Sequence, residues 1–126
     1  MNINKVKKTS KYSMEIKGKY LIVTGEGFFQ LDDAIEFRRD FENLTRRVST
    51  ARLELIINTP NLKTCSPDLQ PEIDRMARTY HKTTFSKKHM VLPNSSIAGL
   101  QLKRIDTTGL FKTMNFIDNI NMVVAC

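Results

Sequence analysis

The sequence predicts a small α/β protein: one domain with a mostly parallel sheet of four to five strands, an N-terminal antiparallel hairpin and helices packed on the sheet. The first observation is length, because 126 residues suit a single domain. The second is periodicity, because short β-rich runs alternate with segments whose apolar residues recur every three or four positions. The third is composition, since 40% hydrophobic and 26% charged residues are ordinary globular values. We expect the domain to span residues 12–126.

Residues 1–11 precede this domain as a basic leader that we expect to be flexible. The formal net charge is +7, and residues 1–19 hold six lysines against one acidic residue, Glu15. No apolar stretch follows the leader, so it does not read as a signal peptide, and two cysteines are too few for a disulfide framework. A cytoplasmic location is the expectation. The candidate anion-binding residues are Lys5, Lys7, Lys8 and Lys11, with Lys87 and Lys88.

The first half of the domain begins with two strand-like runs, residues 12–16 and 20–24, joined by a turn that contains Gly18. From Leu31 to Val48 the apolar residues form a single stripe at helical spacing, with two aspartates at its start and two arginines at its end, as the helix dipole favours. Residues 52–57 are again rich in β-branched and apolar side chains. This pattern predicts a hairpin, a helix and a buried strand.

The second half begins with an irregular polar loop over residues 58–65. Ser66 then stands in the N-cap position of a helix that extends to Lys82, with Pro67 as its first residue. Residues 89–92 form the next strand. The serines of Pro93–Ser96 cap a third helix that ends at Gly109, and residues 111–124 contain the last strand and a short closing segment.

Strands that alternate with helices imply right-handed crossovers and parallel pairing. We therefore expect the apolar stripes of the helices, Phe41 included, to pack against strand residues of the sheet. We expect that sheet to contain Leu55, Ile57, Val91 and Leu92.

Signatures of catalysis are sparse. His81 and His89 lie eight residues apart on different elements, which is no zinc-ligand spacing, and we expect both at the surface. The acidic pairs open helices, where capping accounts for them, and Cys65 has no accompanying Cys–His pattern. We therefore expect no enzyme activity, no metal and no cofactor. A small-molecule or nucleotide site at the strand ends stays open, because this class of fold hosts many functions.

A glycine pair follows the second strand. Gly25 and Gly27 lie between a strand and a helix, the setting of a phosphate-binding turn. The third glycine of the dinucleotide-binding pattern is absent and two phenylalanines follow directly. We therefore interpret this segment as a plain strand–helix turn.

Two polar loops are candidates for binding. Residues 58–66 and 93–96 each follow a strand and lead into a helix, and in open α/β sheets such loops carry ligand and partner contacts. The alternative is that both only cap helices. The candidate partner-binding or phosphorylation residues are Asn58, Thr64, Ser66, Asp68 and Ser95.

The element order and two segments resemble the STAS domain, a family named for sulfate transporters and anti-sigma factor antagonists. Residues 55–69 are similar to the family's apolar strand, polar turn and helix opening. Residues 90–111 are similar to its following strand, helix and glycine-terminated turn, with Gly109 and Leu110 in the corresponding place. The chain departs from the family at the phosphorylation motif, where Ser66 comes first and Pro67 occupies the usual acceptor position.

The resemblance implies a non-catalytic, cytoplasmic regulatory module of bacterial type that contacts a protein partner. That partner would be a kinase-type anti-sigma factor or another regulator, contacted through the loop and first turn of the second helix, and a homodimer is left open. A phosphate on Ser66 would add charge and bulk to the contact. The alternative function is binding of nucleic acid or of an anionic surface through the basic leader.

Overall fold

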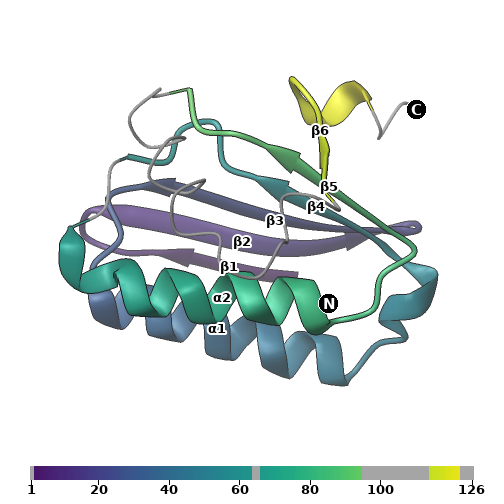
Figure 1. The fold of residues 1–126 in the computed structure, drawn as a ribbon, viewed down its shortest axis with the longest axis horizontal. Coiled ribbons are helices and arrows are strands. Elements are labelled where there is room, and N and C mark those ends of the chain that lie inside the picture. Colours follow the sequence, from purple (N-terminus) through teal and green to yellow (C-terminus); the bar gives the residue numbers. More distant parts are fainter. Residues whose placement is uncertain (1, 64–65, 95–113, 123–126) are drawn as a thin grey trace.

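The computed structural model describes residues 2–63, 66–94 and 114–122. They form one six-stranded sheet in which the spatial order of the strands is the chain order, β1 to β6 (Figure 1). The strands are β1 (Asn2–Val6), β2 (Ser10–Lys17), β3 (Tyr20–Gly27), β4 (Glu54–Asn58), β5 (Lys87–Val91) and β6 (Asn115–Phe116). The pairings β1/β2 and β2/β3 are antiparallel, and β3/β4, β4/β5 and β5/β6 are parallel. The predicted α/β architecture is thus present.

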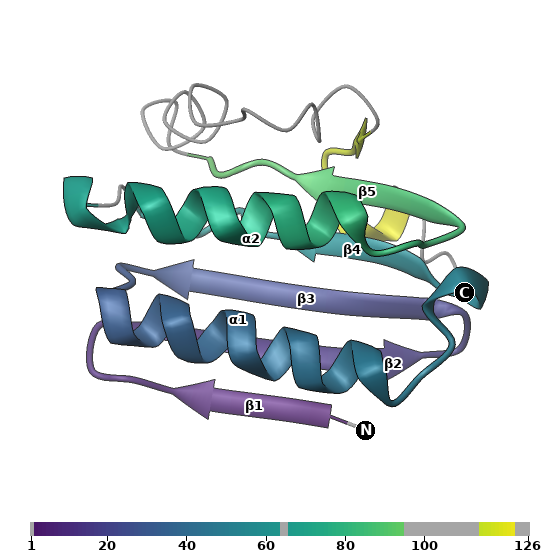
Figure 2. The same cartoon turned by 60° about the horizontal axis from the view of Figure 1, so that its bottom comes forward.

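In the described residues, α-helices connect two of the three parallel strand pairs. They are α1 (Leu31–Arg46), between β3 and β4, and α2 (Gln70–Lys82), between β4 and β5. Short 3-10 turns are η1 (Thr50–Arg52), η2 (Pro67–Leu69) and η3 (Ile120–Met122). Both connections step across the sheet in one direction, and crossovers share one hand, so both helices lie on the same face. Figure 2 shows α1 along the N-terminal half of the sheet and α2 along β4 and β5.

The helices cover a core built by strict alternation along the strands. Leu21 and Val23 of β3 and Leu55 and Ile57 of β4 face the helices, and Phe41 of α1 is fully buried against them. The ring of Phe41 meets Tyr80 of α2 edge to face at a centroid distance of 5.0 Å. Each helix therefore contributes one apolar stripe, as its periodicity predicts.

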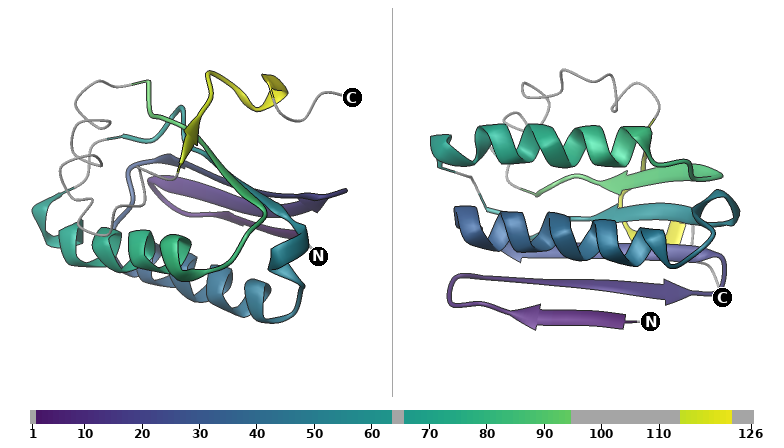
Figure 3. Two further views of the ribbon diagram at one scale, coloured as in Figure 1. Left: turned by 45° about the vertical axis from the view of Figure 1, so that its right-hand side comes forward. Right: turned by 90° about the horizontal axis from the view of Figure 1, so that it is seen from below.

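The opposite face of the sheet carries a second, smaller apolar cluster. Ile22, Ile56 and Val91 of three neighbouring strands meet Ile117, which follows β6. Figure 3 shows β6 and η3 on the side of the sheet away from the helices. Val91, expected as a residue of the sheet, belongs to β5 and lies on the face away from the helices. Because β5 is apolar on both faces, its sequence pattern does not tell which residues point to which side.

The N-terminal residues differ from the flexible leader expected over residues 1–11. Residues 2–6 form β1, which pairs in register with β2 so that Ile3 lies opposite Met14 and Lys5 opposite Tyr12. Alternate residues of β1 face the helical layer, where Ile3 packs against the core. The sheet therefore has one strand more than the upper limit of the prediction. The third predicted helix lies outside the described residues.

Candidate interaction surface at the ends of the parallel strands

The loop after β4 is tied to the end of β5. The Thr59 amide and hydroxyl both donate to the Val91 carbonyl, at 3.1 and 2.9 Å, and the Asn94 amide donates to the Pro60 carbonyl at 2.8 Å. These bonds hold the two polar segments identified in the sequence side by side. Ser95, the last candidate of the second segment, lies outside the described residues, as does Thr64 of the first.

Asn58 is the last residue of β4 and faces β3. Its side-chain amide donates to the Thr24 hydroxyl over 3.5 Å, and these two residues are direct partners in the parallel register. The side chain is half-buried on the sheet face away from the helices. Asn58 therefore links two strand ends, and its amide is only partly accessible to a partner.

Ser66 occupies the N-cap position of η2, as the sequence predicts, and Pro67 follows as the first residue of that turn. In the described part of the chain its hydroxyl makes no capping bond to a backbone amide and donates instead to the exposed carboxylate of Asp68. Leu69, at the end of the turn, is buried in the core and anchors it. The structure thus presents Ser66 and Asp68 together on a fixed turn.

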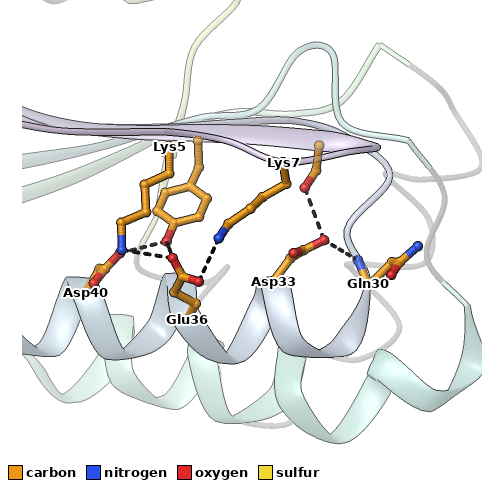
Figure 4. A network of polar contacts seen from close by, with 8 residues as sticks. Lys5, Lys7, Gln30, Asp33, Glu36 and Asp40 are labelled. Atoms are coloured by element: carbon orange, nitrogen blue, oxygen red, sulfur yellow. Dashed lines mark hydrogen bonds and ion pairs between the residues drawn. The ribbon is translucent and has the colours of Figure 1, made fainter.

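Two of the candidate lysines form ion pairs with carboxylates of α1. The Lys5 ammonium lies 2.8 Å from a Glu36 oxygen and 2.9 Å from Asp40, and the Lys7 ammonium lies 2.7 Å from the other Glu36 oxygen. Figure 4 shows both lysines reaching from the sheet to the helix. The bonds from Lys5, and then those from Lys7, lower the pKa of Glu36 to about 2. These ion pairs fasten β1 over α1.

The buried phenol of Tyr12 completes this network. Its hydroxyl donates to Asp40 at 2.6 Å, and the ring packs edge to face on Phe37. Burial, and then the Asp40 carboxylate, raises the pKa of Tyr12. These contacts hold the basic side chains of β1 against an acidic face of α1.

The other lysines fall into two separate places. Lys8 and Lys11 line a hollow next to the loop after β4, described below, whereas Lys87 and Lys88 begin β5 at the far end of the sheet. Lys88 donates to the His81 carbonyl at 2.9 Å, and burial lowers its pKa. The six lysines therefore do not form one anion-binding surface.

The hollow has a volume of about 390 Å³ and is bounded by three segments. Residues 6–11 form one wall, the end of β3 with Glu26 and Gly27 forms the floor, and Asn61 and Lys63 of the loop after β4 form the other wall. The Lys11 ammonium lies 2.7 Å from Glu26, whose second oxygen accepts from the Asn61 amide over 3.5 Å. Four lysines and one glutamate give the lining a net charge of +3.

Gly27 joins these walls through its backbone. Its amide donates to the Asn61 carbonyl at 3.1 Å, and its own carbonyl accepts from the Lys63 amide at 2.9 Å. The residue has a φ of +83°, and a Cβ there would lie 2.5 Å from the Thr9 carbonyl oxygen. Only glycine fits this close approach of two chain segments. The predicted strand–helix turn is therefore also the place where the β1–β2 turn, the end of β3 and the loop after β4 meet.

Sequence reasoning missed a buried polar chain on the opposite face of the sheet. His89 is 4% exposed, and its Nε2 lies 2.8 Å from a Glu54 carboxylate oxygen. Its Nδ1 lies 2.9 Å from the side-chain nitrogen of Asn115, and Lys19 lies 3.3 Å from the second Glu54 oxygen. The bond with His89, ahead of that with Lys19, lowers the pKa of Glu54. The prediction that His89 lies at the surface is wrong.

This chain of polar contacts joins three neighbouring strands. Glu54 belongs to β4, His89 to β5 and Asn115 to β6, and both ring nitrogens of His89 are occupied. The visible signal was Glu54 itself, a charged residue inside an apolar run. Because the histidine is enclosed and fully bonded, we interpret it as a support for β6 and not as a proton-transfer group.

No protein-family model matches the chain, and no curated protein matches it. No helix in the described ranges has both the length and the apolar character that a bilayer crossing requires. Those ranges also hold no group of three or more His, Cys, Asp or Glu side chains arranged for a metal ion. The resemblance to the STAS domain therefore rests on the sequence segments given above.

Proposed function

We propose that this protein is a non-catalytic regulatory module that binds a protein partner, similar to an anti-sigma factor antagonist. The partner contacts the loop after β4 and the η2 turn that leads into α2. The observation that carries the proposal is the fixing of this loop by Thr59 and Pro60 against the end of β5. Backbone that is already held by such bonds loses little entropy on binding and so suits a protein contact.

Ser66 is the regulatory residue in this proposal. It lies half-exposed at the start of η2 beside the Asp68 carboxylate. A phosphate there would place two anionic groups next to each other on the contact surface, and the resulting repulsion would act on the partner and on the turn. The buried anchor Leu69 would keep the rest of the domain in place.

The alternative function, binding of nucleic acid or an anionic surface through all six lysines, has less support. Lys5 and Lys7 are paired with α1, and Lys87 and Lys88 lie at the other end of the sheet from Lys8 and Lys11. Nucleic-acid binding proteins usually present their basic side chains as one continuous patch or stripe. The six candidate lysines of this protein do not form such a patch.

The proposal is tested by retention of cellular proteins on the immobilised full chain. We expect Ser66→Ala to keep the wild-type set of retained proteins and to change stability by about 0.5 kcal/mol at most, as for an ordinary surface site. We expect Ser66→Asp to release one or more of them, measured by quantitative mass spectrometry. Thr84→Asp is the matched control, because Thr84 is exposed and precedes β5 at the far end of the sheet. Equal retention by all four proteins would remove the η2 turn from the interface.

A further inference from the structure

The positive charge of the described residues gathers at the end of the sheet where the parallel strands begin. Three connections meet there, on the right in Figures 1 and 2: the β2–β3 turn (17–20), the segment from the end of α1 through η1 to β4 (46–54) and the segment from the end of α2 to β5 (81–88). We call these three segments the basic end. They hold eight lysines and arginines against one acidic residue, Glu54, which gives a net charge of +7. The other described residues comprise nine basic and eleven acidic ones, which gives a net charge of −2.

Backbone hydrogen bonds hold the three segments of the basic end side by side. The Glu54 amide donates to the Lys19 carbonyl at 2.8 Å, which joins the start of β4 to the β2–β3 turn. The amide and the hydroxyl of Ser86 both donate to the Leu53 carbonyl at 2.9 Å, which joins the α2–β5 connection to the same place. The basic end is therefore a fixed part of the fold, and its exposed side chains share one surface.

Most of this positive charge has no carboxylate partner in the described ranges. Lys19 lies 3.3 Å from Glu54, and Lys88 is half-buried and donates to a backbone carbonyl of α2. Glu54 is itself buried, and its two oxygens are occupied by His89 and Lys19. Glu15, the acidic residue next along the chain, is exposed on β2. The remaining basic residues are exposed and form no ion pair with a described residue: Lys17, Arg46, Arg47, Arg52, Lys82 and Lys87.

The ends of the helices account for only part of this pattern. Basic residues in the last turn stabilise the negative end of the helix dipole, which accounts for Arg46 of α1 and Lys82 of α2. Lys17 ends β2, Arg52 ends η1 and Lys87 begins β5, so these three compensate no α-helix end. Like charges that are crowded together repel one another, and a bound polyanion would remove that repulsion.

The side chains of the basic end favour phosphate groups as the ligand. Three of its six unpaired cations are arginines, and a guanidinium binds two phosphate oxygens at once. None of the large apolar side chains exposed in the described chain belongs to the basic end. Insertion into a lipid bilayer, or the apolar centre of a protein interface, would need such side chains. The phosphate backbone of a nucleic acid needs none.

The dimensions and the aromatic residues of the basic end favour a duplex. Strands β2 to β5 lie side by side, about 4.8 Å apart, so the basic residues at their ends form a row about 14 Å long. One strand of nucleic acid presents about four phosphates over that length. The aromatic side chains here, Tyr20 and Phe85, are half-buried and buried, so they offer no ring for stacking with single-stranded bases.

We propose that the basic end binds the phosphate backbone of double-stranded nucleic acid without reading the base sequence, with Arg47, Arg52 and Lys87 among the contacts. The site lies at the opposite end of β4 and β5 from the loop of the proposed protein contact. The inference therefore goes beyond the proposed function and does not depend on it. The lysines of β1 and of the β1–β2 turn play no part in this site, and its arginines were not among the candidates from the sequence.

The first test is fluorescence anisotropy of a fluorescein-labelled DNA duplex of mixed sequence, titrated with the full chain. We expect saturable binding at about 50 mM NaCl and a linear fall of log affinity with log salt concentration. Contact with about four phosphates gives a slope of about −3.6. A duplex of the same length and shuffled sequence should bind equally well. No saturable binding, or a slope shallower than about −1, would overturn the proposal.

The second test removes two of the proposed contacts. In the double variant Arg52→Gln and Lys87→Gln the salt slope should become shallower by about 2, because each phosphate contact contributes about 1. The matched control, Arg39→Gln and Lys8→Gln, also removes one arginine and one lysine, both exposed and outside the basic end. Its slope should change by less than about 0.5. Equal changes in the two double variants would overturn the proposal, since they would show that only the net charge matters.

Competition identifies the kind of polyanion that the basic end prefers. Polyglutamate and phosphatidylserine vesicles, compared at equal negative charge, should displace the labelled duplex less effectively than unlabelled duplex does. Stronger displacement by polyglutamate would overturn the proposal in favour of an acidic protein, and stronger displacement by vesicles would overturn it in favour of an anionic membrane surface. None of these measurements involves Ser66, so their failure would leave the proposed protein contact standing.

Discussion

Replacement of Gly27 by alanine should destabilise the protein. The size of the expected loss can be worked out by comparison with the same replacement at Gly18. Gly18 and Gly27 both have positive φ, of 60° and 83°. Among the described residues nothing lies within 4 Å of a Cβ built on Gly18, whereas a Cβ on Gly27 would lie 2.5 Å from the Thr9 carbonyl oxygen. Gly18→Ala therefore adds only backbone strain, which costs about 1 kcal/mol. Gly27→Ala adds the same strain and a collision with backbone.

The collision can be relieved only if the β1–β2 turn moves away from β3. That movement breaks the bond from the Phe28 amide to the Thr9 carbonyl, at 2.8 Å, and the bond from the Thr9 hydroxyl to the Phe28 carbonyl, at 2.7 Å. Each contributes about 1 kcal/mol, so we expect Gly27→Ala to lower the free energy of unfolding by about 3 kcal/mol. The difference from Gly18→Ala is then about 2 kcal/mol.

Urea denaturation followed by circular dichroism measures both losses on one scale. The slope of unfolding free energy with urea should match the wild type in each variant, so that midpoint shifts report stability alone. Losses of equal size in the two variants would refute the reasoning, since they would show that the turn does not pack on Gly27.

Two further predictions concern the core and the N-terminal strand. Phe41→Ala should lower the free energy of unfolding by about 3–5 kcal/mol, because a ring with no exposed surface leaves a cavity against Tyr80; a loss below about 1 kcal/mol in urea denaturation would contradict this packing. Glu36→Gln should lower the melting temperature at neutral pH, since the pKa of Glu36 is lowered to about 2 and its stabilising effect is present above its ordinary value near 4.5. The gap to the wild type should close as the pH falls from 4.5 toward 2, and a gap independent of pH would show that Lys5 and Lys7 do not act through this carboxylate.

The elements that the sequence predicted well are those whose signal is local. The hairpin, α1, β4, α2 and β5 each carry their own period of apolar residues, and the structure has them within a few residues of the predicted bounds. The N-cap position of Ser66 is local in the same sense, because it depends on the order of Ser66 and Pro67. Such features can be predicted without knowing which distant segments of the chain they contact.

What escaped prediction depends on segments far apart in the chain. In β1 the inward positions are Ile3 and Lys5, and a lysine reads as solvated until Glu36 and Asp40 of α1 are known to lie beneath it. The pairing of Glu54 with His89 likewise requires the register of β4 and β5, which fixes which side chains share a face.

The candidate site shows the same division. Ser66 and Asp68 were named as candidates from one short stretch of sequence, and in the structure the two side chains are hydrogen-bonded. Lys63 was not singled out, because its place near the turn that carries Lys8 depends on Gly27, whose backbone is bonded to the loop after β4. The hollow is formed by three separate segments, so the sequence of no single segment predicts it.

The match between chain order and strand order has a consequence for synthesis on the ribosome. Among the described residues, each strand from β2 to β6 pairs with the described strand that precedes it in the chain, so the sheet can grow one strand at a time as the chain emerges. The antiparallel β1–β3 unit needs only short loops to close, whereas β4 and β5 each wait for a helix. Until α1 has emerged, Lys5 and Lys7 lack the carboxylates that hold β1. β1 is thus secured by a helix translated about thirty residues later.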